Sequence, residues 1–280
     1  MAYKDILLHL DSYPDATPME VVDEATWVCA ALGGAVTATT FQTRLPVKSN
    51  VIADRLIGLS QLAEEEEARC QDNVDHLLAR FAEQAGKLGL ANETRPIEEL
   101  YPLQSERLAT VARTRDICVI PYVGVIAPQT ALAEAVVFSS GRPVLLFRGG
   151  TEPPRSFKRI LVAWDGGRAS IRAVTDALPL LKQAQEVRIL TILGDKPTAV
   201  GGQADELLRH LAAHGVQAEA EEYTAAGEGA GKIIERVADE RGFDLLVMGA
   251  YGHSRLREFF LGGATQHILT APIIPVLLSH

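Results

Sequence analysis

A glycine-rich segment near the C-terminal end of the sequence has the residue types that bind phosphate groups. Gly249 and Gly252 follow a short apolar run, and Gly262 and Gly263 precede a helical pattern. Glycine tolerates positive φ, so backbone N–H groups of the first pair can point into a concavity. The unpaired N–H groups and the dipole of a helix that starts near Gly263 favour an anion. The segment predicts a phosphate site, and a glycine turn followed by a helix cap is the structural alternative.

Three positive side chains, His253, Arg255 and Arg257, lie between the two glycine pairs. They suit the binding of a ground-state phosphate, which by itself does not lower a reaction barrier. A phosphoryl-transfer enzyme also needs a cation clamp and an oriented nucleophile. His253 and Glu258 are the obvious candidates for a base, but a phosphate contact and a surface charge explain them equally well. We therefore expect that the protein is not an enzyme and that ATP turnover is absent or very slow.

A second candidate contact is Asp165, which ends another apolar run and precedes Gly166 and Gly167. In open α/β sheets, ligands bind at the carboxyl ends of the strands. An aspartate there can accept hydrogen bonds from ribose hydroxyls or from the edge of an adenine. The alternative is that Asp165 caps the following helix, and one aspartate can do both.

Other motifs indicate no further chemistry. His210 and His214 have the spacing of zinc ligands on a helix, but residues 211–213 read Leu-Ala-Ala, so no HExxH is present. A solvated helix face is the favoured interpretation. The sequence contains neither GxxxxGK[ST] nor GxSxG, which excludes a P-loop ATPase and a common hydrolase motif. The run Gly227–Gly231 precedes a helical pattern and is interpreted as a helix N-terminus.

An internal repeat organises the elements that carry these residues. Three pairs of segments match in the same order, offset by 154, 128 and 132 residues: 4–11 with 158–165, 116–121 with 244–249, and 142–147 with 274–279. Residues 149–154 have the glycine and proline content of a linker. The sequence therefore predicts two copies of one domain, at residues 1–150 and 151–280.

The first copy is longer than the second between the first two matching pairs. Apolar residues recur at three- and four-residue steps over about 60–87, which predicts a long amphipathic helix. The run Glu64–Glu67 lies within it. We interpret this run as a solvated face and as first-turn charge that complements the helix dipole, in preference to a metal site or a site for a basic partner.

The second copy alternates short apolar runs with helical patterns. Strands are expected at 158–165, 187–193, 216–223, 244–248 and 274–278, and helices at about 169–184, 203–214, 229–241 and 263–270. Continuous Val/Ile/Leu runs separated by helices are typical of buried parallel strands with crossover connections. The predicted fold class is α/β, with two Rossmann-like doubly wound domains that each contain a five-stranded parallel sheet.

Composition limits the compartment and the partners. The 280-residue chain is 47% hydrophobic and 22% charged, with a net charge of −9, so it is expected to fold and not to bind nucleic acid. Its three cysteines, Cys29, Cys70 and Cys118, have no CxxC spacing, and the first residues do not resemble a secretory signal. The uncharged apolar stretch 117–133 is interrupted by proline and glycine, so no membrane span is expected there. These features favour the cytoplasm.

Together, the repeat and the glycine segment resemble the universal stress protein family, in a tandem form with two family domains in one chain. The nucleotide-binding branch of that family has a motif of Gly, two residues, Gly, nine residues, Gly and Ser or Thr. Gly249, Gly252 and Gly262 match its glycines, whereas Gly263 stands where Ser or Thr is usual and Thr265 follows two positions later. This departure removes one hydroxyl donor to phosphate.

The resemblance implies a site for ATP or another adenine nucleotide, with or without Mg²⁺, in the second copy. It assigns the contacts to Ala163, Trp164, Asp165, Leu193, Met248, Gly249, Gly252, His253, Arg255, Gly262, Gly263, Ala264 and Thr265. It also implies that the two copies pair as a pseudo-dimer through their last strands, 143–147 and 274–278, alone or within a homodimer.

The first copy lacks this motif. Pro121 stands where the second copy has Gly249, and proline has no N–H to offer a phosphate. The loop after Pro121 is four residues shorter than its counterpart, and Gly124 alone keeps the glycine pattern. Asp11, which ends the first strand, is therefore interpreted as a helix cap.

Two functions remain open. The first is a stress-response sensor or regulatory module that binds an adenine nucleotide in its second copy. The second is an apo scaffold that acts through protein contacts without nucleotide.

Overall fold

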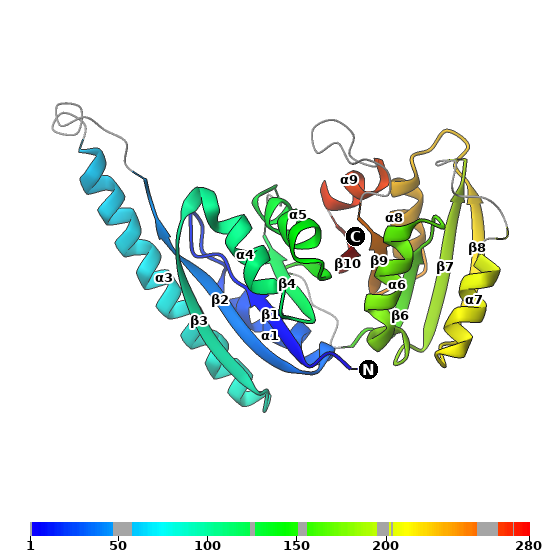
Figure 1. Ribbon diagram of the computed structural model, residues 1–280, viewed down its shortest axis with the longest axis horizontal. Helices are drawn as coiled ribbons and strands as arrows, with labels where there is room; N and C mark the ends of the chain where they lie inside the picture. Colours follow the sequence, from blue (N-terminus) through cyan, green and yellow to red (C-terminus); the bar gives the residue numbers. More distant parts are fainter. Residues whose placement is uncertain are drawn as a thin grey trace.

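The protein is described by a computed structural model that covers residues 2–46, 58–123, 127–150, 156–194, 202, 204–250, 263–270 and 272–280. Strands and helices alternate along these ranges (Figure 1). The strands are β1 (Asp5–His9), β2 (Ala35–Arg44), β3 (Asn92–Leu100), β4 (Ile117–Tyr122), β5 (Val144–Arg148), β6 (Arg159–Ala163), β7 (Glu186–Leu193), β8 (Glu219–Thr224), β9 (Leu245–Gly249) and β10 (Val276–Ser279). The helices are α1 (Met19–Leu32), α3 (Leu59–Lys87), the 3₁₀ turn η1 (Tyr101–Leu103), α4 (Gln104–Ala112), α5 (Ala127–Ser140), α6 (Arg168–Leu181), α7 (Ala204–Ala213), α8 (Ala230–Glu240) and α9 (Gly263–Thr270).

The described strands form one ten-stranded sheet in the order β3-β2-β1-β4-β5-β10-β9-β6-β7-β8. Neighbouring strands are parallel within each group of five. The two groups meet where β5 and β10 pair antiparallel, with Leu145 opposite Leu277. The predicted α/β fold with two Rossmann-like five-stranded sheets is confirmed, and so is their pairing through the last strands. Residues 1–150 and 151–280 are called the N-terminal and C-terminal halves below.

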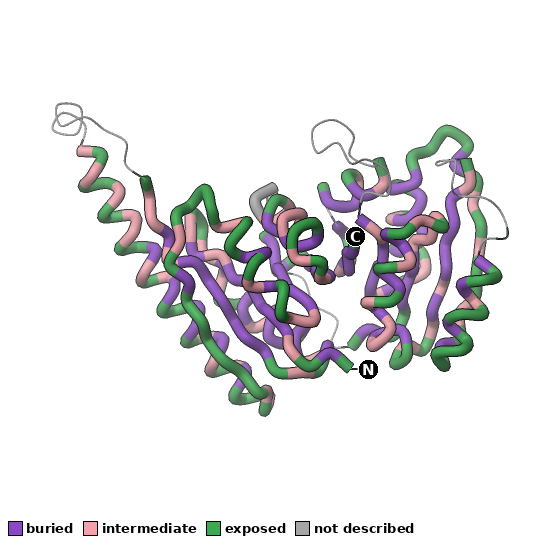
Figure 2. Tube along the Cα trace, in the orientation of Figure 1, coloured by how far each residue is buried: buried purple, intermediate pink, exposed green. Residues whose placement is uncertain are grey.

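Helices cover both faces of this sheet, as the doubly wound prediction requires. One hydrophobic cluster holds side chains of α1, α3, α6 and α7, and a second, on the opposite face, holds side chains of α4, α5, α8 and α9. The central strands of each half are buried on both sides, which explains their continuous apolar sequences (Figure 2). Both halves use the same layering, so equivalent loops lie at equivalent sheet edges.

The internal repeat extends to individual hydrogen bonds. The carboxylate of Asp116, just before β4, accepts the N–H groups of Lys4 and Asp5 at 2.7 and 3.1 Å. Asp244, just before β9, accepts the N–H groups of Lys158 and the following residue at 2.8 and 3.0 Å. Equivalent aspartates therefore hold the first strand of each half at the same place in the sheet.

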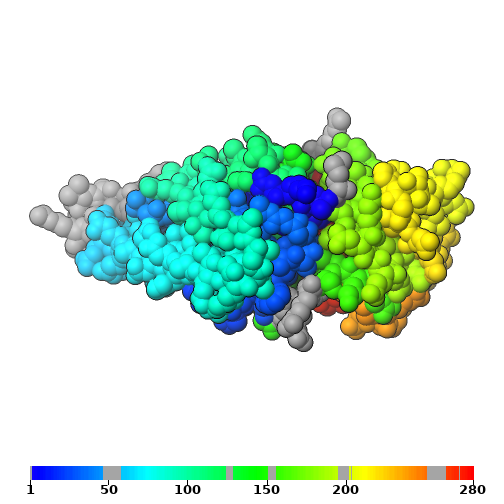
Figure 3. All heavy atoms as spheres, turned by 90° about the horizontal axis from the view of Figure 1, so that it is seen from below, coloured from blue at the N-terminus to red at the C-terminus, as the bar shows by residue number. Residues whose placement is uncertain are grey.

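Two tyrosines of the N-terminal half make hydrogen bonds to backbone carbonyls of the C-terminal half. The Tyr122 hydroxyl donates to the carbonyl of Pro272 at 2.8 Å, and its burial raises the pKa of Tyr122 to about 12. The Tyr3 hydroxyl donates to the carbonyl of Asp176 at 2.7 Å. Seen from below, residues near the N-terminus lie directly against the C-terminal half (Figure 3). The halves are thus joined by side-chain contacts as well as by the β5–β10 pair.

The long helix predicted in the N-terminal half is α3. Glu64 and Glu65 of its acidic run are exposed, as predicted for a solvated face, but the run is not the first-turn charge that was expected. Because α3 begins at Leu59, Glu64–Glu67 lie beyond the first turn, which contains no acidic residue. The carboxylate of Glu67 instead accepts hydrogen bonds from the N–H of Leu45 at 2.8 Å and from the Arg44 guanidinium at 2.7 Å. These bonds lower the pKa of Glu67. Glu67 therefore fixes α3 to the end of β2.

Candidate functional site

A pocket lies in the C-terminal half at the carboxyl ends of β6 and β9. It contains about 480 Å³ of space, including the part open to solvent. Its lining residues come from β6, β7 and β9 and from the N-terminal parts of α6, α8 and α9: Ala163, Trp164, Asp165, Ser170, Leu190, Ile192, Ala230, Ile234, Met248, Gly249, Ala264 and Thr265. This is the edge of the sheet where doubly wound folds bind ligands.

The pocket brings together many of the residues that the sequence singled out. The predicted residues in its wall are Ala163, Trp164, Asp165, Met248, Gly249, Ala264 and Thr265. Gly263 begins α9 next to this wall. Leu193 ends β7 but does not line the pocket, and its carbonyl accepts the N–H of Ala225. Gly252, His253, Arg255 and Gly262 lie outside the described residues.

Asp165 is held by its own loop. Its Oδ1 accepts the N–H of Gly167 at 2.9 Å, and its side chain is half-buried at the pocket wall. The N-cap position of α6 is Gly167, which has no side-chain capping bond. Asp165 therefore does not cap α6 in the way the alternative interpretation expected. Asp165 lines the pocket, and a carboxylate can accept more than one hydrogen bond.

Gly249 allows the end of β9 to approach the first turn of α6. A Cβ atom at this position would lie 2.6 Å from the backbone carbon of Ala169 and 2.6 Å from the nitrogen of Ser170. Real Cβ atoms do not come so close to backbone atoms, so a side chain would push β9 and α6 apart. Glycine at 249 is thus explained by packing, in addition to any role toward a ligand.

Five pocket residues were not among the predicted contacts: Ser170, Leu190, Ile192, Ala230 and Ile234. Leu190 and Ile192 belong to β7, and Ala230 and Ile234 belong to α8. The glycine run 227–231 could have indicated the α8 contribution. As predicted, this run forms a helix N-terminus, with Gly229 as the N-cap of α8, and that helix end faces the pocket.

Two ring side chains of the N-terminal half, His9 and Phe41, are equivalent in the repeat to two residues that line the pocket of the C-terminal half. His9 and Ala163 both end the first strand of their half, opposite Thr39 and Leu190. Two residues further along the second strand, Phe41 therefore corresponds to Ile192. The rings of His9 and Phe41 are both buried and pack with centroids 5.2 Å apart. These two rings therefore stand at the positions whose counterparts, Ala163 and Ile192, line the pocket of the C-terminal half.

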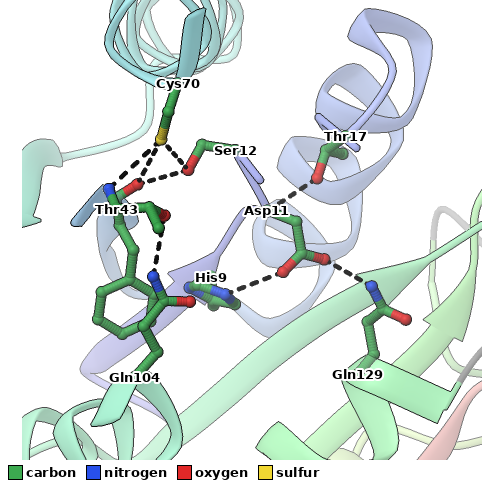
Figure 4. Close-up of polar contacts among 9 residues, drawn as sticks. His9, Asp11, Ser12, Thr17, Thr43, Cys70, Gln104 and Gln129 are labelled. Atoms are coloured by element: carbon green, nitrogen blue, oxygen red, sulfur yellow. Dashed lines mark hydrogen bonds and ion pairs between the residues drawn. The ribbon is translucent and has the colours of Figure 1, made fainter. Parts of the chain in front are cut away.

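Asp11 does not cap α1, so that interpretation is wrong. The N-cap of α1 is Pro18, and no side chain caps the helix. The Asp11 carboxylate lies between two side chains instead, with Nε2 of His9 3.3 Å from Oδ1 and Nε2 of Gln129 2.8 Å from Oδ2 (Figure 4). The backbone N–H of Asp11 donates to Oγ1 of Thr17. The partners of the Asp11 carboxylate therefore come from β1 and α5 of the same half.

The cysteines and the His210–His214 pair were also candidates for a second site. Cys29, Cys70 and Cys118 are free and buried, and burial raises the pKa of Cys29 and Cys118. The rings of His210 and His214 pack against each other with centroids 4.7 Å apart. In the described part of the chain, no group of three or more His, Cys, Asp or Glu side chains could hold a metal ion. No helix in the same ranges is long and apolar enough to cross a membrane.

The sheet order and the pocket at the strand ends define a Rossmann-like protein of the doubly wound α/β class. Residues 156–280 match the model of the Universal stress protein family. Over 98% of this chain and 99% of the relative, the sequence is 26% identical to universal stress protein Slr1230 of Synechocystis sp.. Residues 156–280 therefore belong to the universal stress protein family, and the full-length similarity to Slr1230 agrees with the resemblance that the sequence predicts.

Solved structures agree on the fold. A universal stress protein from Archaeoglobus fulgidus matches with a TM-score of 0.72 and 15% identity, covering 98% of this chain and 95% of its own. A putative universal stress protein from Pseudomonas aeruginosa matches with a TM-score of 0.56 and 17% identity, covering 99% and 93%. Both matches extend over the N-terminal and the C-terminal halves.

Proposed function

We propose that the protein is a sensor or regulatory module that binds one adenine nucleotide, AMP, ADP or ATP, in the pocket of the C-terminal half. In this proposal, residues 151–280 form a nucleotide-binding universal-stress-type domain and residues 1–150 form a degenerate copy that packs against it. The observation that carries the proposal is a pocket that is lined both by Asp165 and by the N-terminal turn of α9.

The pocket offers a different environment to each part of a nucleotide. Leu190, Ile192 and Ile234 provide an apolar wall that suits a base. Asp165 can accept hydrogen bonds from ribose hydroxyls. The N–H groups and dipole of α9, which begins at Gly263, suit a phosphate. These three features favour a nucleotide over a purely apolar ligand or a free anion.

Occupancy by nucleotide is the proposed signal, and catalysis is not part of the proposal. The proposed contacts suit the binding of a ground-state nucleotide, which by itself does not lower a reaction barrier. The paired halves then act as one unit, which responds through nucleotide binding and not through turnover.

The proposal can be tested through the fluorescence of Trp164, which lines the pocket. Trp27 is the other tryptophan of the chain, so a Trp27→Phe background reports on the pocket alone. AMP, ADP or ATP is expected to change this signal saturably, and Asp165→Ala to weaken binding about 10- to 100-fold by removing charged hydrogen bonds. Saturation that is unchanged in Asp165→Ala would contradict the proposed site. No saturation with any of the three nucleotides would favour the apo scaffold.

Gly263→Ser is expected to tighten nucleotide binding by about three- to tenfold, since it adds one hydroxyl donor near the phosphate. A Cβ atom at Gly263 would meet nothing within 4 Å, so the substitution fits without moving α9. Titration of Gly263→Ser and Gly263→Ala with ADP separates the effect of the added hydroxyl on affinity from the effect of the added Cβ atom. Equal affinities in the two variants would mean that no phosphate lies at this helix end.

A further inference from the structure

The side chain of His280, which follows β10, bridges two segments that border the pocket. Its Nδ1 lies 2.9 Å from the carbonyl oxygen of Ala250, the residue after β9. Its Nε2 lies 3.4 Å from a guanidinium nitrogen of Arg168, the first residue of α6. A carbonyl oxygen only accepts hydrogen bonds, so Nδ1 is the donor, and Nε2 of the neutral ring accepts from Arg168. One imidazole therefore joins the end of β9 to the start of α6.

Both segments carry residues that line the pocket. Gly249 directly precedes Ala250, and Ser170 lies two residues after Arg168. The two segments also pack on each other, because a Cβ atom on Gly249 would lie 2.6 Å from the backbone nitrogen of Ser170. The shape of the pocket between these residues depends on how closely the end of β9 packs on the first turn of α6. The hydrogen bonds of His280 hold the two segments together at this contact.

The ring of His280 also contacts the N-terminal half. It packs on the ring of Phe138 with centroids 4.7 Å apart and an interplanar angle of 64°, which is the edge-to-face arrangement that aromatic pairs favour. Phe138 belongs to α5, which lies at the junction of the two halves (Figure 1). Through this ring pair, the N-terminal half reaches the imidazole that borders the pocket.

The two halves link the end of their fourth strand to each other in different ways. Tyr122 and Ala250 are equivalent in the repeat, 128 residues apart. The Tyr122 hydroxyl donates directly to the carbonyl of Pro272 in the other half. Ala250 has only a methyl group, and its carbonyl is linked to the other half through His280 and Phe138. Beside the pocket, this link between the halves therefore passes through a side chain that also fixes the pocket wall.

We infer that His280 and Phe138 are positioning residues for the pocket. Phe138 holds the imidazole of His280 in place, and His280 keeps the end of β9 against the first turn of α6. In this role neither side chain has to contact the nucleotide. The inference rests on the proposed nucleotide function, and it makes the affinity of the site in the C-terminal half depend on a residue of the N-terminal half.

The test is a double-mutant cycle on the full-length protein, in which the Kd for ADP is measured in the wild type, Phe138→Ala, His280→Ala and the double variant. Loss of the ring pair should weaken ADP binding about two- to tenfold in Phe138→Ala. His280→Ala should weaken it at least as much, because it also removes the hydrogen bonds to Ala250 and Arg168. Since Phe138 acts through His280, Phe138→Ala should change the Kd by less than about twofold when position 280 is already alanine.

Two milder variants separate positioning from a general loss of packing. His280→Asn keeps an N–H group at the position of Nδ1 but has no ring. Its Kd should lie between those of the wild type and His280→Ala, and should respond little to Phe138→Ala. Phe138→Leu keeps an apolar side chain without the ring, and should weaken ADP binding in the same direction while the thermal unfolding midpoint stays close to that of the wild type.

Tyr101→Ala is the matched control. Tyr101 is a ring of the N-terminal half that is exposed to a similar extent as Phe138, and it packs edge-on against Tyr13 with centroids 5.4 Å apart. Its loss should leave the Kd for ADP unchanged. An unchanged Kd in Phe138→Ala, a loss that is the same with and without His280, or an equal loss in Tyr101→Ala would overturn the inference while nucleotide binding stands. A wild type that does not bind ADP would overturn both the function and this role.

Discussion

Gly249→Ala should lower the free energy of unfolding by about 1–3 kcal/mol and disrupt the pocket. The added methyl group would lie 2.6 Å from the backbone of Ala169 and Ser170, and neither backbone atom can rotate away as a side chain can. The end of β9 and the first turn of α6 must separate, and both line the pocket. Equilibrium unfolding in urea measures the loss of stability, and nucleotide titration measures the loss of affinity.

Gly263→Ala is the matched control, because a Cβ atom there meets nothing within 4 Å. It should change the free energy of unfolding by less than about 0.5 kcal/mol, as for a surface substitution. If Gly249→Ala were as stable as Gly263→Ala, the close packing of β9 on α6 would not be a constraint in solution.

A second large effect is expected from giving the C-terminal half the two ring side chains of the N-terminal half. The double variant Ala163→His with Ile192→Phe should weaken adenine nucleotide binding about 100-fold or more, because the new rings would occupy the pocket. The pair packs in the N-terminal half with ring centroids 5.2 Å apart, so the same architecture can accommodate it. The double variant should therefore lose most of its affinity for nucleotide while its thermal unfolding midpoint stays close to that of the wild type.

Leu193→Phe provides the control for the double variant. It enlarges a residue of the same strand that does not line the pocket, and its affinity should match that of the wild type. Nucleotide binding that survives in the double variant would show that the ligand lies elsewhere.

The sequence predicted the elements of the C-terminal half closely because each signal is local. Each of the five expected strands is observed within a few residues of its predicted bounds, and α9 spans Gly263–Thr270 as expected. The strand expected at 216–223 is observed as β8, Glu219–Thr224. Its first residues belong to the turn after α7, where the apolar Val216 packs into the core without joining the sheet.

The pocket was predicted only in part, because its remaining residues depend on which elements become neighbours. Leu190 and Ile192 look like any buried strand residues, and their position beside Asp165 follows from the pairing of β7 with β6. Ala230 and Ile234 reach the pocket because α8 packs against α9. Periodicity identifies a strand or a helix but does not give the order of strands in a sheet.

The N-terminal half shows the same limit. The repeat shows that Pro121 stands at the position equivalent to Gly249. It does not show that His9 packs on Phe41, since His9 and Phe41 are far apart in sequence. The role of Asp11 was misjudged for the same reason. Its partner Gln129 lies on α5, more than a hundred residues away.

The most direct test of the central claim is a calorimetric titration of the full-length protein with ADP that measures the number of sites per chain. One site is expected, because the C-terminal half has an open pocket and the equivalent positions of the N-terminal half are filled by His9 and Phe41. Two sites per chain, or no binding heat at millimolar ADP across several temperatures, would contradict the account.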